Sequence, residues 1–445
     1  MADTSYKKEP VDKWIIDPMK RFLNNSTMSG IVLFSSALIA ILLSNSPWAD
    51  DFHHFWEIRF SIGFHDWQLS KSLHHWINDG LMAVFFFVVG LELKREIISG
   101  ELSNPRAALL PIVAAIGGML VPALIFLIIN PSGEASGGWG IPMATDIAFA
   151  LGFLYMLGDK VPVSLKIFLT ALAIADDLGA VLVIAFFYTS DINVISLLTG
   201  AGFMLVLIIA NRIGISNTLF YGIVGIGGLW LAFLMSGVHA TIAAVLAAFT
   251  IPAKVKYSED VFDRKLSGLL ARFREAHPNN SPTVTTEQLH ILEKVRYVSK
   301  KALTPLQRLE HSMHPLVAFI IMPLFALANA GITLSAESLS LLTSNITIGV
   351  FLGLLLGKVV GIVGLVTMLI RFGWAELPVD FTRRHLLGAG FLAGIGFTMS
   401  LFISNLAFEN KIYIEEAKMG ILLASVVAGL IGYFILKSAR STKSA

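Results

Sequence analysis

The chain has 445 residues, of which 55% are apolar and only 14% are Asp, Glu, Lys or Arg, and its formal net charge is +2. An ordinary soluble domain carries about 25% charged residues, and a soluble fold of this length needs more polar surface than this sequence supplies. The composition excludes a soluble enzyme, a nucleic-acid-binding protein and a disordered scaffold, and it indicates a protein that crosses a membrane several times.

The first 27 residues form a charged segment ahead of the first apolar run. Five basic residues between Lys7 and Arg21 resemble the start of a signal peptide. The charged region is too long for that, however, and no small-residue cleavage site follows Leu43. We interpret residues 1–27 as a cytoplasmic tail that leads into the first membrane span.

Twelve apolar segments approach the length of about 20 residues that a helix needs to cross the hydrocarbon. They are 28–45, 76–97, 107–129, 139–157, 164–188, 194–210, 217–235, 238–252, 316–333, 346–370, 386–408 and 415–437. Basic residues gather on one side of this arrangement, 28 against four, and such an excess is typical of the cytoplasmic side. We therefore predict an all-α integral membrane protein with twelve transmembrane helices and both termini in the cytoplasm. Helices one to eight occupy 28–252, helices nine to twelve occupy 315–437, and 438–445 form a C-terminal tail.

Two polar segments interrupt the spans. Residues 50–74 alternate in polarity around a glycine turn at Gly63, with strands expected at 56–62 and 67–70, which is typical of a β-hairpin on the outer side. Because a two-stranded hairpin alone is marginal in water, we expect it to pair with a second copy and form a homodimer. Residues 253–314 form a cytoplasmic loop with helical turns on either side of 277–282, and we interpret this loop as a solvated connector.

Four ionisable residues fall deep inside the predicted spans: Asp146, Asp176, Asp177 and Lys358. A charged side chain at the centre of a bilayer costs several kcal/mol, roughly, and usually marks the path of an ion or a substrate. A structural ion pair is the alternative, but one lysine cannot neutralise three aspartates. The four residues therefore predict an ion pathway.

The adjacent carboxylates at Asp176 and Asp177 indicate a cation site. Neighbouring residues on a helix point about 100° apart, so the two side chains can flank one small cation without facing each other. Sodium favours oxygen ligands, by analogy with calcium and magnesium, and it would compete with protons for this pair. Intramembrane proteases and isoprenoid synthases also use aspartates, but Gly158-Asp159 lacks the first glycine of the protease motif, and Ala180 replaces the last aspartate of the synthase motif.

The fourth and eleventh spans are expected to be broken. Pro142 removes a backbone donor shortly before Asp146, and four glycines lie between Gly388 and Gly396 in the eleventh span. Interrupted helices in corresponding halves of a chain point to a transporter site, and Asp146 and Lys358 can compensate the charge of the broken helix ends. For the glycines alone, close helix packing remains an open alternative.

Motifs between residues 76 and 400 occur in a distinctive order. They are WINDGLMAVFF at 76–86, GLELKRE at 90–96, ATDIAFALG at 144–152, the pair Asp176-Asp177, SGVHAT at 236–241, RLEH at 308–311, PLFA at 323–326, Gly357-Lys358 and GIGFTMS at 394–400. Together they resemble the NhaA family of sodium/proton antiporters, an example of inverted repeats in transporters. The resemblance implies inverted-topology repeats and two broken helices that cross at mid-membrane. It also implies electrogenic exchange of sodium or lithium for protons across the bacterial inner membrane, with no cofactor.

The resemblance also implies roles for individual residues. Asp176 and Asp177 match the residues that bind the ion and the proton, Thr145 and Asp146 match the broken-helix pair, and Lys358 matches a lysine that pairs with Asp176 until sodium enters.

A second group of residues matches the region that the family uses to respond to pH: Glu92, Arg95, Glu96, His239, Glu310, His311 and His314. Histidine near a carboxylate titrates close to neutral pH, which suits a switch. A solvated helix end, or for His239 a packed or exposed histidine, is the alternative interpretation. The long loop 253–314 and Gln307, where some members carry lysine, leave the pH profile open.

Two other transport functions need to be weighed against antiport. A sodium-coupled symporter of a small solute would need a larger polar pocket, whereas the mid-membrane polar residues here are nearly all charged. A channel usually forms a symmetric ring or filter from several copies, whereas this site is asymmetric within one chain. Antiport is the favoured interpretation, with sodium and protons as substrates and membrane lipid as the surroundings.

Overall fold

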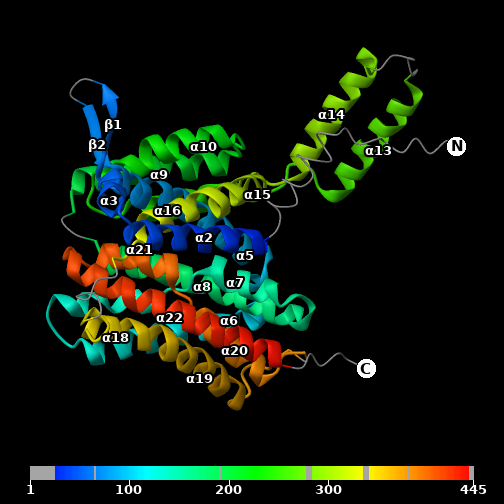
Figure 1. The fold of residues 1–445 in the computed structure, drawn as a ribbon. Coiled ribbons are helices and arrows are strands. Elements are labelled where there is room, and N and C mark those ends of the chain that lie inside the picture. Colours follow the sequence, from blue (N-terminus) through cyan, green and yellow to red (C-terminus); the bar gives the residue numbers. More distant parts are fainter. Residues whose placement is uncertain are drawn as a thin grey trace.

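The computed structural model describes residues 26–64, 67–189, 192–276, 283–333, 340–378 and 380–439. Most of these residues are helical (Figure 1). The predicted tail before residue 26, the centre of the loop at 277–282 and the tail after 439 lie outside the described residues.

The first half of the chain contains helices and one small sheet. Its elements are α2 (Ser26–Ser44), α3 (Ala49–Glu57), β1 (Arg59–Phe64), β2 (Trp67–Ser72), α4 (Leu73–His75), the π-helical turn η2 (Trp76–Leu81), α5 (Met82–Ser99), η3 (Glu101–Ser103), α6 (Pro105–Ile129), the 3-10 helix η4 (Glu134–Met143), α7 (Ile147–Met156), η5 (Gly158–Lys160), α8 (Val163–Phe187) and α9 (Val194–Ile213).

The second half of the described chain is helical throughout. Its elements are α10 (Thr218–Val224), η6 (Gly225–Trp230), α11 (Leu231–Leu234), α12 (Ala240–Thr250), α13 (Glu259–Glu275), α14 (Thr286–Ala302), α15 (Pro305–Leu316), η7 (Val317–Ile321), α16 (Met322–Asn329), α18 (Asn345–Leu352), η8 (Gly353–Gly357), α19 (Lys358–Arg371), α20 (Arg383–Ala393), α21 (Phe397–Ala407) and α22 (Lys411–Ser438).

The helices form two layers (Figure 1). The first layer contains α2, α5, α9 to α12, α15 and α16, in which α5 packs on α12 and α16 packs on α2. The second layer contains α6 to α8 and α18 to α22, in which α6 packs on α19 and α22 packs on α18 and α20. Contacts of α2 with α7, α5 with α8 and α16 with α21 join the layers.

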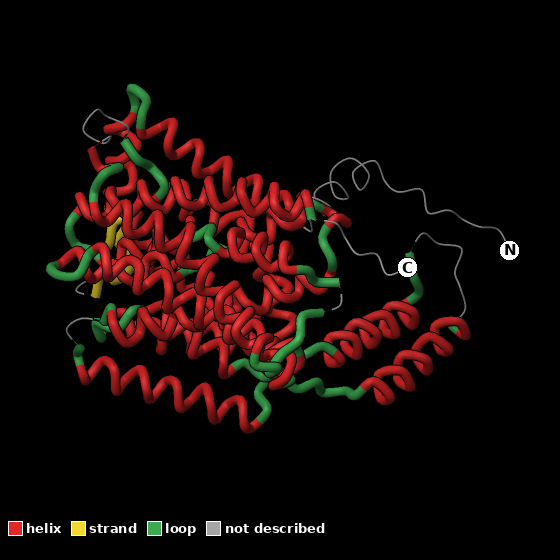
Figure 2. The backbone as a smooth tube through the Cα atoms, turned by 90° about the horizontal axis from the view of Figure 1, so that it is seen from below, coloured by secondary structure: helices red, strands yellow, loops and turns green. Residues whose placement is uncertain are grey.

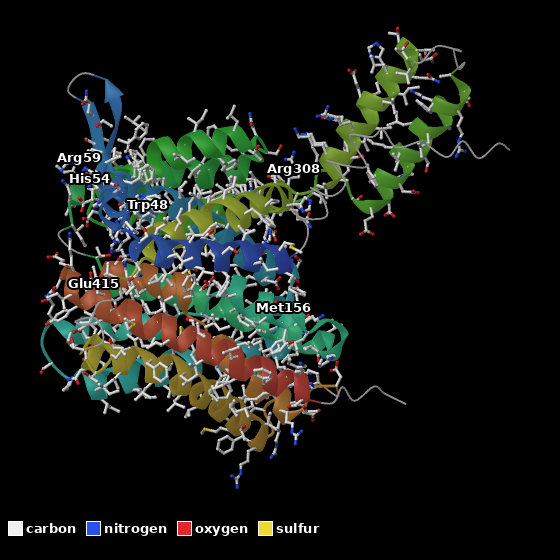
Figure 3. The ribbon with its side chains drawn as sticks, in the orientation of Figure 1. Trp48, His54, Arg59, Met156, Arg308 and Glu415 are labelled. Carbon is white, nitrogen blue, oxygen red and sulfur yellow. The ribbon has the colours of Figure 1, made fainter. Side chains whose placement is uncertain are left out.

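The two polar segments lie at opposite ends of the bundle (Figure 1). The β1–β2 ribbon marks one end, called the hairpin end below, where Arg59 and Glu415 also lie (Figure 3). Helices α13 and α14 mark the other, called the loop end, where Met156 and Arg308 lie (Figure 3). This arrangement separates the two polar segments by the full length of the helices, as expected for segments on opposite sides of a membrane.

Eight helices are long and apolar enough to cross a membrane, or nine if the bent pair of α20 and α21 is one span, among the described residues. The predicted spans 217–235 and 238–252 correspond to shorter apolar helices, Thr218–Leu234 and Ala240–Thr250. The span predicted at 76–97 forms η2 and α5, and its second half holds several charges, Glu92 among them. The ninth predicted span begins earlier than expected, because the helix already starts at Pro305.

The predicted hairpin is present, but its first strand starts later than expected. β1 pairs antiparallel with β2, with Arg59 opposite Ser72 and Ile62 opposite Leu69. Residues 49–57, which include the start of the predicted strand, are the helix α3 instead. Asp50 and Asp51 lie in its first turn, where carboxylates stabilise a helix through its dipole.

The polar loop contains more structure than the helical turns predicted for it. Helices α13 and α14, of 17 residues each, pack on each other and project from the loop end of the bundle (Figure 2). A capping box starts α14. The Thr285 hydroxyl accepts a hydrogen bond from the Gln288 backbone N–H, and Gln288 Oε1 accepts one from the Thr285 backbone N–H. The helical turns predicted on either side of 277–282 are thus two full helices that pack on each other.

Candidate ion-binding site

The adjacent aspartates lie in the middle of the long helix α8 and are each only 1% exposed. Because they are about 100° apart around the helix, they meet different surroundings. Asp176 Oδ2 accepts a hydrogen bond from Lys358 Nζ at 2.6 Å, in an ion pair whose side chains are both fully buried. Both carboxylate oxygens of Asp177 are buried without a hydrogen-bond partner. The pair therefore has one occupied carboxylate and one free one.

Lys358 is held in place by a close crossing of two helices. It is the first residue of α19, which follows the π-helical turn η8, and α19 packs on α6. Where the helices cross, a Cβ added to Gly117 would overlap the backbone carbonyl of Gly361, and a Cβ at Gly361 would overlap that of Gly117. Only glycine allows backbones to approach this closely. The crossing thus fixes the position from which Lys358 reaches Asp176.

Asp146 joins the starts of the two helices α7 and α21. It is the N-cap of α7, where its Oδ1 accepts a hydrogen bond from the Phe149 backbone N–H at 3.1 Å. Its Oδ2 accepts bonds from the backbone N–H and the hydroxyl of Thr398, in the first turn of α21. One carboxylate thus lies at the positive ends of two short helices, where the dipoles stabilise a negative charge.

Further hydrogen bonds connect the two interrupted segments. The backbone N–H of Asp146 donates to the Ile395 carbonyl at 2.7 Å, and the Thr145 hydroxyl donates to the Ala393 carbonyl at 2.8 Å. The Ser400 hydroxyl donates to the Ile141 carbonyl at 2.8 Å. Helices α20 and α21 bend by 43° at their break. The backbone groups freed by the two interruptions are therefore satisfied by the partner segment, as membrane burial requires.

The sequence did not predict a role for Thr398, the residue that links Asp146 to α21. The signal was present, because a threonine follows a glycine-rich break in the eleventh span and can stabilise the start of a half-helix. What the sequence lacked was its partner, which lies 252 positions away.

A cavity of about 220 Å³ lies between the two layers and contacts Asp177. Asp146, Met399, Glu92 and His314 also line it. Tyr155, another lining residue, is 38% exposed and lies near Met156 toward the loop end (Figure 3). The free carboxylate of Asp177 is thus connected with the loop end by a mostly apolar space that is large enough for a few water molecules.

Six of the residues predicted to respond to pH lie on α5 and α15, where Glu92 interacts electrostatically with Arg95, Glu96 and Glu310. Arg95 contacts both Glu310, with its Nε 2.9 Å from Oε1, and Glu96, with its Nη2 2.9 Å from Oε1. His314, which lies near Glu310 and His311, lines the cavity together with Glu92.

His239 is separate from all of these residues. It is the N-cap of α12, and its Nε2 lies 2.7 Å from the Tyr188 carbonyl oxygen, where α8 ends. Since α8 belongs to the second layer and α12 to the first, this hydrogen bond joins the two layers.

Among the described residues, no group of three or more His, Asp or Glu side chains could hold a resident metal ion. Asp176 and Asp177 supply two carboxylates, of which one already binds Lys358. Such a sparse ligand set suits a monovalent ion that binds and leaves better than a metal held permanently.

Comparison with known protein sequences shows which family the chain belongs to. The family model described as Na+/H+ antiporter 1 matches residues 20–436. The chain belongs to this family. It is 50% identical over 430 residues to the Na(+)/H(+) antiporter NhaA of Oleidesulfovibrio alaskensis, covering 96% of this chain and 95% of that protein. It is 51% identical to the NhaA of Acidithiobacillus ferrooxidans, covering 94% of this chain and 96% of the relative.

The NhaA 1 of Saccharophagus degradans is 48% identical over 447 residues, covering 98% of this chain and 96% of that relative. Membership of the Na+/H+ antiporter 1 family therefore covers the two layers and both interrupted spans. It identifies the chain as a multi-pass membrane transporter rather than an enzyme.

Proposed function

We propose that this chain exchanges sodium or lithium ions for protons, electrogenically, across the inner membrane of a bacterium. The observation that carries the proposal is the buried Lys358–Asp176 pair beside the unpartnered Asp177 at the end of the cavity. A buried carboxylate without a partner is costly as a free anion. Asp177 therefore holds either a proton or a cation, and the two compete for it.

The exchange follows from this competition. A sodium ion that enters the cavity binds the Asp177 carboxylate, which must release its proton first. The ion then attracts Asp176 and displaces Lys358 from it, and the buried Lys358 ammonium, left without its partner, gives up a proton. Two protons therefore leave for each sodium ion that binds, which makes the exchange electrogenic. When the ion leaves, Asp177 and Lys358 each take up a proton and the Lys358–Asp176 pair forms again. In this scheme Asp177 is the indispensable ligand, and Thr145 and Asp146 keep the broken helices in position around it.

The test uses everted membrane vesicles with an acidic interior and a fluorescent pH probe. Addition of sodium or lithium should raise the internal pH without any organic solute, and a membrane potential should change the rate if the exchange is electrogenic. Asp177→Asn should abolish the response, whereas the exposed Asp51→Asn, the same chemical change on α3, should leave it intact. Normal exchange by Asp177→Asn would contradict the mechanism, and dependence on a solute would favour a symporter.

We further propose that the chain has twelve transmembrane helices in inverted-topology repeats, with the loop end and both termini in the cytoplasm. The support is the excess of basic residues at the ends and loops assigned to that side. The two interrupted spans that meet at Asp146 support the repeats. Single cysteines introduced at Lys71 and Lys300 test the orientation. In intact cells, a membrane-impermeant thiol reagent should label the cysteine at position 71 and not the one at position 300.

Regulation by pH is proposed for the charged groups at the loop end. The Arg95 ion pairs with Glu96 and Glu310 connect α5 with α15, and protonation of either carboxylate would weaken that connection. Glu310→Gln should therefore shift the pH dependence of exchange, while exposed Glu293→Gln on α14 should not. An unchanged profile for Glu310→Gln would exclude this pair from the pH response.

A homodimer through the β1–β2 hairpin is proposed as well. Phe60 and Ile62 of β1 are 52% and 53% exposed, and a ribbon of two strands is marginal without a partner. Replacement of residues 59–72 by a short linker should convert the purified dimer to a monomer in light scattering. A dimer that persists in this variant would contradict the proposed contact.

A further inference from the structure

A cluster of buried amides lies at the hairpin end, on the other side of the site from the cavity. Asn329, the last residue of α16, is fully buried. Its side-chain oxygen accepts a hydrogen bond from Asn405 Nδ2 at 2.7 Å, and its amide nitrogen donates to Asn78 Oδ1 at 2.9 Å. His74 Nε2 lies 3.1 Å from the same Asn329 oxygen.

These bonds are not equivalent, because they join different parts of the bundle. His74, Asn78 and Asn329 belong to elements of the first layer, and the first two follow directly after β2. Asn405 belongs to α21, the half-helix of the second layer whose first turn binds Asp146. The Asn329–Asn405 hydrogen bond is therefore a polar contact between the layer that carries the site and the layer that faces it.

An aromatic contact lies next to this hydrogen bond on the same two helices. Phe402 packs against Phe325, with ring centroids 6.3 Å apart, and against Phe86 of α5, at 5.3 Å. All three rings are at most 1% exposed. Phe402 and Asn405 are three residues apart on α21, and Phe325 and Asn329 are four apart on α16, so each pair occupies one face of its helix.

We propose that the Phe325–Phe402 and Asn329–Asn405 contacts form a lock that closes the hairpin end of the ion path, and that they separate in each transport cycle. The cavity connects Asp177 with the loop end, while the lock lies toward the hairpin end. An ion bound at Asp177 can leave there only after α21 and α16 part. The inference rests on the proposed exchange of sodium for protons.

Cross-linking tests whether the two helices must separate. The chain contains no cysteine, so an introduced pair supplies the only thiols. In Asn329→Cys/Asn405→Cys, a disulfide or a short bifunctional thiol reagent should stop exchange, and a reductant should restore it. The matched pair Ser61→Cys/Ser70→Cys joins the two strands of the hairpin at the same end of the protein, where the two hydroxyl oxygens are 2.8 Å apart, and cross-linking it should leave exchange unchanged.

These outcomes test the proposed lock separately from the proposed exchange. Undiminished exchange by a fully cross-linked Asn329→Cys/Asn405→Cys protein would overturn the lock, and so would equal inhibition of the control pair. Absence of exchange in the unmodified chain would instead count against the proposed function.

A second variant decides the question if the reduced cysteine pairs do not transport. Asn405→Ala removes one hydrogen bond and should shift the equilibrium toward the state open at the hairpin end by about two- to tenfold. The half-saturating sodium concentration should then fall on the hairpin side and rise on the loop side. Ser404→Ala, which removes a hydroxyl that donates to the Leu401 carbonyl of the same helix, should change neither. A change in the same direction on both sides would indicate a purely structural role and overturn the lock.

Discussion

At the scale of single residues, the decisive feature is one ammonium that pairs with only one of two adjacent buried carboxylates. Lys358 and Asp176 are both fully buried as side chains, so neither can be solvated if its partner is removed. Lys358→Met should destabilise the protein by about 3–5 kcal/mol, because it leaves an uncompensated buried charge. The double variant Lys358→Met/Asp176→Asn should recover most of this loss.

Thermal denaturation in detergent measures both variants, and Lys437→Met at the exposed end of α22 is the control. If the losses of stability caused by Lys358→Met and by Asp176→Asn simply add in the double variant, the ion pair contributes no coupling energy. The proposed displacement of Lys358 by sodium would then lose its energetic basis.

A half-buried histidine at the hairpin end should make the stability of the protein depend on pH. His74 lies just before the span that begins at Trp76, and burial, reinforced by the positive charge of Lys418, lowers its pKa from 6.5 to about 4. The unfolded chain therefore binds this proton at a higher pH than the folded one. The free energy of unfolding should fall as the pH drops from about 6.5 to 4, by at most about 1.4 kcal/mol per pH unit.

The melting temperature measured across this pH range checks the expectation. His74→Gln keeps a hydrogen-bond donor for Asn329 but cannot titrate, so acidification should lower its melting temperature less than that of the native chain. His53→Gln, a change of an exposed histidine, should behave like the native chain. Equal acid sensitivity of the native chain and His74→Gln would show that His74 is not responsible.

At the scale of elements, the crossing of α6 and α19 should be intolerant of a single methyl group. A Cβ at Gly361 would overlap the Gly117 carbonyl, so Gly361→Ala must push the helices apart and move Lys358 away from Asp176. We expect a loss of most exchange activity and a lower melting temperature. Gly364→Ala, on the same helix but with open space around its Cβ, is the matched control and should be close to native. Equal activity of the two variants would refute this role of the crossing.

The sequence predicted those elements whose signals are local. Pro142 and the glycines up to Gly396 indicated two interrupted spans, and unusual depth singled out Asp146 among the charges. It could not predict that both interruptions meet at this aspartate, because Thr398 reaches it across 252 positions. The predicted start of the hairpin was wrong for a local reason. The alternating residues around Trp56 favoured a strand, whereas the acidic first turn of α3 favours a helix.

At the scale of the whole molecule, α13 and α14 form a separate unit that projects from the two layers (Figure 2). α13 has no buried residue, and α14 packs its buried face on α13. The unit begins and ends at one place, because the backbone N–H groups of Lys256 and Tyr257 both donate to the Lys301 carbonyl, at 3.2 and 3.3 Å. A short glycine-serine linker can therefore replace residues 259–300 without moving the flanking helices.

Such a variant should retain sodium/proton exchange within about twofold of the native rate and nearly the native melting temperature, as surface changes usually do. Vesicle assays at several pH values measure the rate and its pH dependence together. If the maximal rate is native but the pH profile shifts, the hairpin acts on regulation through α15, which begins directly after it at Pro305. If exchange is lost although the protein remains folded, the two layers are not sufficient for transport, and the site at Asp177 depends on a part of the chain that lies far outside it.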